Sequence, residues 1–329
     1  MQFRLELQPE PSKNKITPGQ RIALIGSCFT THMAERLCQA KFTVEENPFG
    51  VVFNPISIAN QLNMILENRR FSNADLFEAN ELQNSWFFHS RFSHPEASAA
   101  LEAMNNSVDN AHAFMKDADW LILTLGSAFT YRIFEPSANA PAGFAVANCH
   151  RVPANRFDHR LENVENLKNA LAESIRMVRQ HNPDIKIVFT ISPVRHYREG
   201  LIENNRSKSA LHLTVMDLCN TLQDVQYFPA YELVIDDLRD YRFYAEDMVH
   251  PNYAATGYVW EKFAEAYFQP EGKRFLEEMK QLRLAVQHRS LHPGSAMHAK
   301  FRAKMLENTR SLQDKYPFLD LSEELLHFS

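Results

Sequence analysis

The stretch that decides the fold is RIALIGSCFTTH, residues 21–32. Its first five residues are mostly apolar and lie between two glycines, which is typical of a buried strand. Gly26-Ser27-Cys28 is small and turn-like, and we expect Thr30 or Thr31 to cap the helix that follows. The stretch therefore predicts a strand, a tight turn that carries Ser27, and a helix.

The predicted turn gives Ser27 a chemically useful place. A serine there lies at the carboxyl edge of a sheet, beside free backbone N–H groups and the positive end of a helix. Such groups can stabilise an oxyanion. The simpler alternative is a small residue that merely fits a crowded turn between a strand and a helix. The stretch alone does not separate these two interpretations.

The rest of the chain alternates apolar strands with amphipathic helices. Further strands are predicted at 41–46, 119–125, 184–191 and 227–235. Helices are predicted at 30–40, from Asn54-Pro55 to residue 66, from Pro95 to residue 116, at 162–181, from a cap at Ser207, and from Pro251. Loops are predicted at 67–94 and 130–160. The first of these is rich in aromatic side chains. This alternation indicates an α/β fold with a five-stranded parallel sheet and helices on both faces.

Composition narrows the class of protein. The chain has 329 residues, 45% of them hydrophobic, which is enough for one large domain with an extension. A net charge of −5 argues against a nucleic-acid partner. No apolar run is long enough to span a membrane, the N-terminus does not resemble a signal peptide, and the four cysteines show no framework spacing. We therefore expect a cytoplasmic protein with no membrane partner.

The pattern changes near residue 271. Residues 271–329 contain two amphipathic helical segments separated by Pro293-Gly294. We interpret residues 1–270 as the main domain and 271–329 as a helical extension. That extension either covers the main domain or forms a homo-oligomer contact.

Several residues with catalytic potential follow predicted strands. They are Ser27, Gly50, Gly126, His196 and His250. In parallel α/β sheets the functional site lies beyond the carboxyl ends of the strands. We therefore expect these residues to gather at one edge of the sheet.

Asp247-Met248-Val249-His250 supplies the expected acid–base chemistry. A serine hydroxyl becomes a good nucleophile only when a base removes its proton, and histidine suits that role near neutral pH. A carboxylate on the other ring nitrogen fixes the tautomer and stabilises the imidazolium. An Asp three residues before a His can also ligate a metal such as zinc, so the pair alone leaves that alternative open.

Taken in order, these motifs resemble the SGNH/GDSL hydrolases and, more narrowly, the bacterial GSCFA-domain family. The resemblance covers about residues 2–265 and rests on GSCF at 26–29, NPFGVVFNP at 47–55, LTLGSAFTYR at 123–132, SPVRH at 192–196, Asn205-Arg206-Ser207-Lys208 and Asp247-x-x-His250. It implies a flavodoxin-like three-layer α/β/α fold. It also implies Ser27 as nucleophile, His250 as base and Asp247 as the residue that orients the base, with the backbone N–H groups of Ser27 and Gly50 binding the oxyanion.

The chain departs from the wider superfamily after the third strand. The superfamily has Gly-x-Asn-Asp there, and its Asn side chain is an oxyanion donor, whereas this chain has Gly126-Ser127-Ala128-Phe129. We consider Asn54 and Ser127 as replacement donors, although Asn54 is more simply the N-cap of the helix at Pro55. His196 and Arg195 also face the site or, in the simpler interpretation, belong to a surface loop.

The expected activity is that of a serine esterase acting on a small O-acyl ester, such as an acylated carbohydrate, without a cofactor or a metal. An O-acyltransferase would use the same residues. A non-catalytic ligand-binding protein on the same fold is the alternative from a different class. Cys28 is a rival nucleophile that we rank below Ser27, because the residue after the nucleophile normally lends its backbone and points away.

Overall fold

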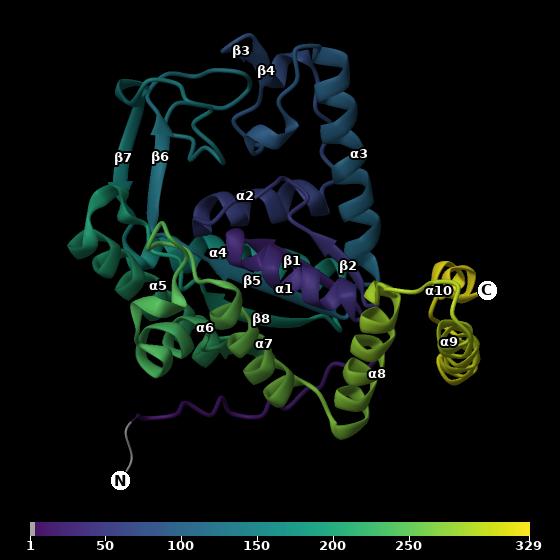
Figure 1. Ribbon diagram of the computed structural model, residues 1–329. Coiled ribbons are helices and arrows are strands. Elements are labelled where there is room, and N and C mark those ends of the chain that lie inside the picture. The colour runs from purple at the N-terminus through teal and green to yellow at the C-terminus, as the bar shows by residue number, and fades with distance from the viewer. Residues whose placement is uncertain (1–3) are drawn as a thin grey trace.

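The computed structural model describes residues 4–329, and its core is one five-stranded parallel sheet (Figure 1). The strands lie in the order β2-β1-β5-β8-β9. Their bounds are β1 Arg21–Gly26, β2 Thr43–Glu46, β5 Trp120–Leu125, β8 Lys186–Ile191 and β9 Val225–Phe228. Counted along the chain this is the 2-1-3-4-5 order of flavodoxin-like folds. The predicted sheet is therefore confirmed.

Helices cover both faces of the sheet (Figure 1). One face carries α2 Pro55–Leu66, α3 Ala97–Lys116, α4 Val164–His181 and α5 Leu201–Thr221. The other carries α1 Cys28–Gln39, α7 Tyr253–Tyr267 and α8 Pro270–Gln287. Every residue of β5 is buried, as expected of a central parallel strand with helices on both sides.

Two hairpins lie outside the main sheet. One joins β3 Phe77–Ala79 to β4 Leu82–Asn84, and the other joins β6 Phe129–Ile133 to β7 Phe157–Leu161. Both lie in stretches predicted as loops, residues 67–94 and 130–160, so both correct that expectation. The aromatic residues between 67 and 94 pack into the main core, where Trp86, Phe87 and Phe88 are buried.

Three predicted boundaries are wrong. Ser27, rather than Thr30 or Thr31, caps α1, because its Oγ accepts a hydrogen bond from the backbone N–H of Phe29. Helix α5 begins at Leu201, so Ser207 lies inside it and does not cap it. The fifth strand ends at Phe228, since Pro229 cannot extend the ladder of hydrogen bonds. Short helical segments follow, namely α6 Ala230–Glu232 and η5 Leu233–Leu238.

The remaining elements are short turns of helix and the C-terminal helices. The short turns are η1 Asn73–Asp75, η2 Ser90–Phe92, η3 Ala154–Arg156, η4 Tyr197–Glu199 and η6 Tyr241–Phe243. At the C-terminus lie α9 Ala296–Lys315 and α10 Ser322–Phe328, beside α8 (Figure 1, yellow). Phe275 and Met279 of α8 belong to the same buried cluster as Phe263 of α7. Between residues 4 and 329, no helix is both long and apolar enough to cross a membrane.

Candidate active site

Ser27 lies in a turn that only glycine allows at the preceding position. A Cβ on Gly26 would lie 2.2 Å from the carbonyl oxygen of Thr124, and the φ of Gly26 is +152°. The chain therefore passes against β5 and turns directly into α1. Ser27 is 2% exposed, and its Oγ caps the helix by accepting from the Phe29 N–H at 3.3 Å. The predicted strand–turn–helix is confirmed.

Asn47 supports this turn from the end of β2. Its side-chain Oδ1 accepts a hydrogen bond from the Gly26 backbone N–H at 2.8 Å, and its own N–H donates to the carbonyl of Leu24. Asn47 is completely buried and has a left-handed backbone, with φ +45°. Asparagine tolerates that conformation better than most residues. We did not identify this supporting role from the sequence, although NPFG belongs to one of the motifs quoted above.

Asp247 and His250 form a hydrogen-bonded pair in the loop before α7. The distance between Asp247 Oδ2 and His250 Nδ1 is 2.7 Å. The backbone N–H groups of His250 and Val249 donate to the other carboxylate oxygen at 3.0 and 2.9 Å. These hydrogen bonds, with that from the His250 backbone foremost, lower the pKa of Asp247 to about 2. Asp247 therefore stays ionised and holds a proton on His250 Nδ1, which leaves Nε2 to act as a base.

A chain of backbone contacts links these elements at the carboxyl edge of the sheet. Ser27 donates its N–H to the Thr124 carbonyl at 3.1 Å, while the N–H of Gly126 donates to the Phe53 carbonyl at 2.8 Å. The N–H of Arg195 donates to the carbonyl of Val249, beside His250, at 3.2 Å. The ends of β1, β5 and β8 and the loop before α7 thus meet at one edge.

In this structure the Ser27 hydroxyl makes no hydrogen bond to His250. Within residues 4–329 its Oγ takes part in one hydrogen bond, the helix cap, and none joins it to His250. Catalytic hydrogen bonds are often long in the absence of substrate and tighten when it binds. The site therefore holds both partners at one edge of the sheet without joining them.

The two backbone donors expected for an oxyanion are both occupied. The N–H of Ser27 donates to Thr124, and the N–H of Gly50 donates to the carbonyl of Asn47 at 2.7 Å. Both N–H groups are therefore hydrogen-bonded within the fold in this structure. The N–H of Cys28, as the first residue of α1, has no hydrogen-bond partner in the described part of the chain.

Asn54 serves as a helix cap. Its Oδ1 accepts from the Ser57 backbone N–H at 2.8 Å, and its Nδ2 donates to Ser57 Oγ at 3.0 Å. The capping role that we favoured for Asn54 is confirmed. The amide group is therefore directed toward the start of α2, and it does not present an unoccupied donor to Ser27.

Ser127 is likewise engaged elsewhere. Its Oγ lies 3.2 Å from Ser207 Oγ and accepts the N–H of Phe129 at 3.1 Å. Ser207 Oγ also accepts the N–H of Ala128 at 2.8 Å. Ser127 and Ser207 thus fasten the end of β5 to α5.

Lys208 is a buried amine under the same edge. It is 2% exposed, and its Nζ donates to the carbonyls of Gly126 at 2.7 Å and Ser192 at 2.6 Å. Burial lowers its pKa to about 7. Lys208 therefore joins the chain after β5 to the chain after β8. The Asn205–Lys208 motif marked this region in the sequence, but the role of the lysine depends on tertiary contacts.

His196 lies over Gly126 at the end of β8. Its ring packs on Phe53 with centroids 4.6 Å apart, and its backbone N–H donates to Asn204 Oδ1 at 2.9 Å. Burial, helped by the nearby charges of Lys208 and His250, lowers the pKa of His196 to about 3. The imidazole is therefore neutral at ordinary pH.

The structure gives less support to two alternatives, a cysteine nucleophile and a metal site. Desolvation raises the pKa of the Cys28 thiol, which disfavours the nucleophilic thiolate. Among residues 4–329, no group of three or more His, Cys, Asp or Glu side chains is placed to hold a metal ion. Asp247 and His250 therefore lack a third ligand of these types for zinc.

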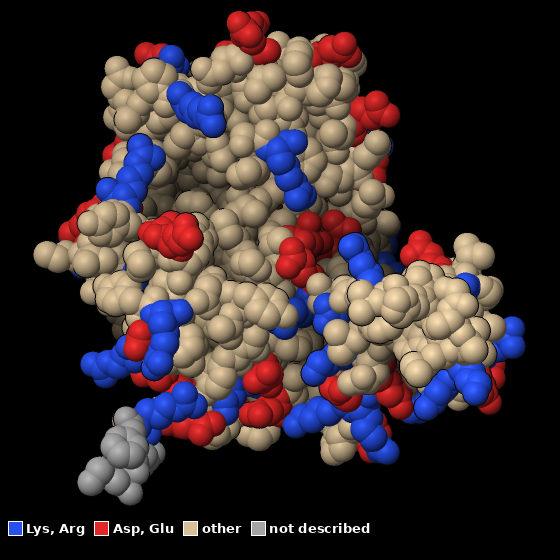
Figure 2. Space-filling model, in the orientation of Figure 1, with Lys and Arg blue, Asp and Glu red and all other residues tan. Residues whose placement is uncertain are grey.

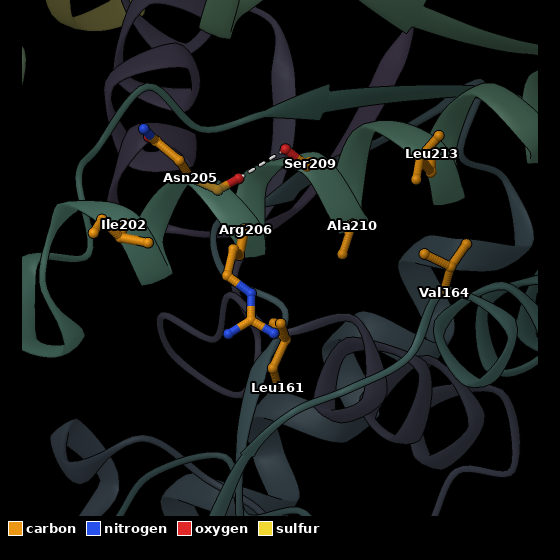
Figure 3. Close-up of a pocket in the computed structure, with 8 residues that line it drawn as sticks. All are labelled: Leu161, Val164, Ile202, Asn205, Arg206, Ser209, Ala210 and Leu213. Carbon is orange, nitrogen blue, oxygen red and sulfur yellow. Dashed lines mark hydrogen bonds between the residues drawn. The ribbon is translucent and has the colours of Figure 1, made fainter.

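One face of the molecule is hollowed. Figure 2 shows a depression on the face below the β3–β4 hairpin and beside the β6–β7 hairpin. A separate open groove of about 520 Å³ runs along the outer side of α5 (Figure 3). Its apolar lining includes Leu161, Ile202 and Leu213, and none of the proposed triad residues contributes to it.

Comparison with solved structures gives remote likenesses. A carbohydrate esterase family 3 protein from Talaromyces cellulolyticus is 10% identical, with a TM-score of 0.36, over 80% of this chain and 99% of that one. A Clostridium thermocellum family 3 carbohydrate esterase is 10% identical, with a TM-score of 0.33, over 80% and 98%. An acetyl xylan esterase from the rumen bacterium Butyrivibrio proteoclasticus is 10% identical, with a TM-score of 0.37, over 77% and 64%. No curated protein matches the chain.

Family models give the clearer result. The model of the GSCFA family matches residues 21–263, from the first residue of β1 into α7. A second model, for the C-terminal domain of GSCFA domain proteins, matches residues 279–329. Ser27, Asp247 and His250 all lie inside the first match. Because that match covers most of this chain, the chain belongs to the GSCFA family.

Proposed function

We propose that the protein is a serine-dependent acyl hydrolase of the SGNH type that acts on a small O-acyl ester. The observation that carries the proposal is the Asp247–His250 hydrogen bond of 2.7 Å, in a loop tied to the sheet edge where Ser27 caps α1. An ionised carboxylate, a histidine with a free Nε2 and a serine at a helix N-terminus are the parts that acyl transfer requires.

In the proposed reaction His250 Nε2 takes the proton of the Ser27 hydroxyl while Oγ attacks the ester carbonyl carbon. The resulting tetrahedral oxyanion collapses, the bond to the alcohol oxygen breaks, and His250 returns the proton to the leaving alcohol. Water then attacks the acyl-serine with His250 again as base. The bond between the acyl carbon and Ser27 Oγ then breaks, His250 returns the proton to Oγ, and the carboxylic acid leaves. Asp247 stays ionised throughout and stabilises the imidazolium.

We extend the proposal to acylated carbohydrates because the β6–β7 hairpin and the turn after His196 carry hydrogen-bonding and aromatic side chains. On the β6–β7 hairpin, Tyr131 stacks on His159 with ring centroids 4.1 Å apart. His159 Nε2 lies 3.3 Å from a carboxylate oxygen of Glu199, in the turn that follows His196. Groups of this kind suit a polyhydroxylated alcohol.

Steady-state hydrolysis of 4-nitrophenyl acetate, and of acetylated monosaccharides, tests the proposal. We expect Ser27→Ala to reduce turnover to background and Cys28→Ala to retain most of it. Turnover that survives in Ser27→Ala but is lost in Cys28→Ala would contradict the assignment of the nucleophile.

A second candidate function is ligand binding without catalysis. It is favoured by the absence of a hydrogen bond between Ser27 and His250 in residues 4–329, and by the engaged N–H groups of Ser27 and Gly50. The same assay separates the two, because a binding protein would show no turnover that depends on Ser27.

A further inference from the structure

We infer that His196 is a catalytic residue whose Nε2–H donates a hydrogen bond to the oxyanion that forms when Ser27 attacks an ester. The inference rests on the proposed function and adds to it the side-chain donor that the reaction requires. It is carried by the position of the His196 ring, by its unpartnered Nε2 atom and by the engagement of every other donor expected there.

The Nε2 atom of His196 is buried and has no hydrogen-bond partner among residues 4–329. A buried polar atom without a partner is costly and uncommon in native proteins. The nitrogen is therefore available to a group that this structure does not contain. It lies beside the carboxyl edge of the sheet rather than in the apolar core.

The direction of the ring follows from its contact with Gly126. A Cβ at Gly126 would lie 2.9 Å from His196 Nε2 and 2.8 Å from the Cβ of Phe53. The absence of a side chain at residue 126 thus leaves room for the imidazole at the end of β5. Two residues earlier, the carbonyl of Thr124 accepts the N–H of Ser27. His196 Nε2 is therefore held at the strand end adjacent to the nucleophile.

Three contacts fix the ring and its backbone. The ring packs on Phe53, the backbone N–H is bound by Asn204, and Lys208 bonds the carbonyls of both Gly126 and Ser192. The segment that carries His196 is thereby tied to the segment that carries Gly126. A donor held in this way loses little free energy to reorganisation when charge develops on the oxyanion.

The protonation state suits a donor rather than a base. A neutral imidazole with its proton on Nε2 donates one hydrogen bond, and it remains neutral because its pKa lies near 3. Neutral histidine is known to act as an electrophile that polarises a carbonyl oxygen. His250, by contrast, has its Nδ1 bound to a carboxylate and so keeps Nε2 free as an acceptor. The two histidines thus take opposite roles at one site.

Other donors at the edge are committed to the fold. The N–H groups of Ser27 and Gly50 and the amide of Asn54 are hydrogen-bonded, as is the hydroxyl of Ser127. The backbone N–H of Cys28 is the second donor that we assign to the oxyanion. One backbone and one side-chain donor together complete a two-point oxyanion site.

Substitution of His196 by Phe, Gln and Ala tests the inference. Phe keeps an aromatic ring on Phe53 without a donor, and Gln places an amide N–H near the position of Nε2. We expect His196→Phe and His196→Ala to lower kcat for 4-nitrophenyl acetate by about 10²–10³-fold with KM changed little. We expect His196→Gln to recover at least about tenfold of that loss, as one restored hydrogen bond to a charged group allows. His112→Ala, at a half-buried histidine on α3, is the control for a histidine outside the site.

The outcomes separate the inference from the proposed function. Full kcat in a folded His196→Phe, in an enzyme whose turnover requires Ser27, would show that the ring only packs and would overturn the inference alone. Turnover independent of Ser27, or no turnover of any ester, would overturn the proposed function and this inference with it. Thermal unfolding of each variant establishes that the measured protein is folded.

Discussion

The side chain of Asn47 accepts the backbone N–H of Gly26, so the end of one strand fixes the turn that presents the candidate nucleophile on its neighbour. The contact spans 21 residues of chain and is completely buried on the side of Asn47. It joins two of the short motifs that are separate in the sequence, GSCF and NPFG.

This contact predicts that Asn47→Ala both destabilises the protein and reduces turnover. Loss of the acceptor leaves a buried N–H unsatisfied, which costs about 1–3 kcal/mol. Urea unfolding and kcat of the folded protein measure the two effects. Asn68→Ala is the matched control, because Asn68 has the same left-handed backbone, with φ +47°, and its Oδ1 has no partner within residues 4–329. Equal destabilisation in the two variants would assign the effect to backbone conformation alone.

The Asp247–His250 pair predicts non-additive loss of activity. His250→Ala should be about as damaging as Ser27→Ala, and the double variant no worse, because members of one catalytic unit do not contribute independently. Asp247→Asn should be severe, since an amide places the wrong tautomer on the ring. The measurement is kcat/KM of the single and double variants. If the fold-loss of kcat/KM in the double variant equals the product of the two single fold-losses, the two residues do not act in the same catalytic step.

The cap made by Asn54 predicts a stability effect without a catalytic one. Asn54→Ala should lower the free energy of unfolding by about 1 kcal/mol and leave kcat of the folded enzyme intact. Asn54→Asp should preserve both, because a carboxylate also accepts the Ser57 N–H. A fall in kcat of about 10²-fold in Asn54→Asp would instead place this side chain at the oxyanion.

His150 predicts a pH dependence of stability that is unrelated to catalysis. It is buried, its Nε2 lies 2.8 Å from the carbonyl of Ser85, and burial lowers its pKa to about 4. The unfolded chain takes up a proton near pH 6.5, whereas the folded protein does not until about pH 4. Stability should therefore be complete above pH 6.5 and fall as the pH drops toward 4, by about 1.4 kcal/mol per pH unit from this residue. Urea titrations of His150→Gln should show a shallower fall than the wild type, and parallel curves would refute the assignment.

Much of the fold follows from local patterns in the sequence. Continuous apolar runs such as residues 120–125 identify the central strands, and Asn54-Pro55 marks a helix start by ordinary cap chemistry. Local patterns do not predict the β6–β7 hairpin, because its strands are five residues each and pair across 23 intervening residues. The start of α5 lies earlier than its cap pattern predicts, because Gly200, with φ +88°, turns the chain into the helix before any conventional cap residue.

The site was predictable only in part, for a related physical reason. Ser27, Asp247 and His250 lie in short motifs with recognisable chemistry, so their positions could be proposed from sequence. The hydrogen bonds of Asn47, Ser207 and Lys208 join strand ends that are distant in the chain, and no local pattern reports them. The hydrogen bonds of the Ser27 and Gly50 N–H groups likewise depend on how the turns pack against β5 and β2.

The measurement that tests the central claim most directly is identification of the residue modified by a serine-reactive fluorophosphonate. Intact-protein and peptide mass spectrometry would locate the adduct, with His250→Ala as the matched variant that lacks the base. The account predicts one adduct, on Ser27, formed rapidly in the wild type and slowly in the variant. A folded wild type that leaves Ser27 unmodified, or carries the adduct on another residue, would contradict it.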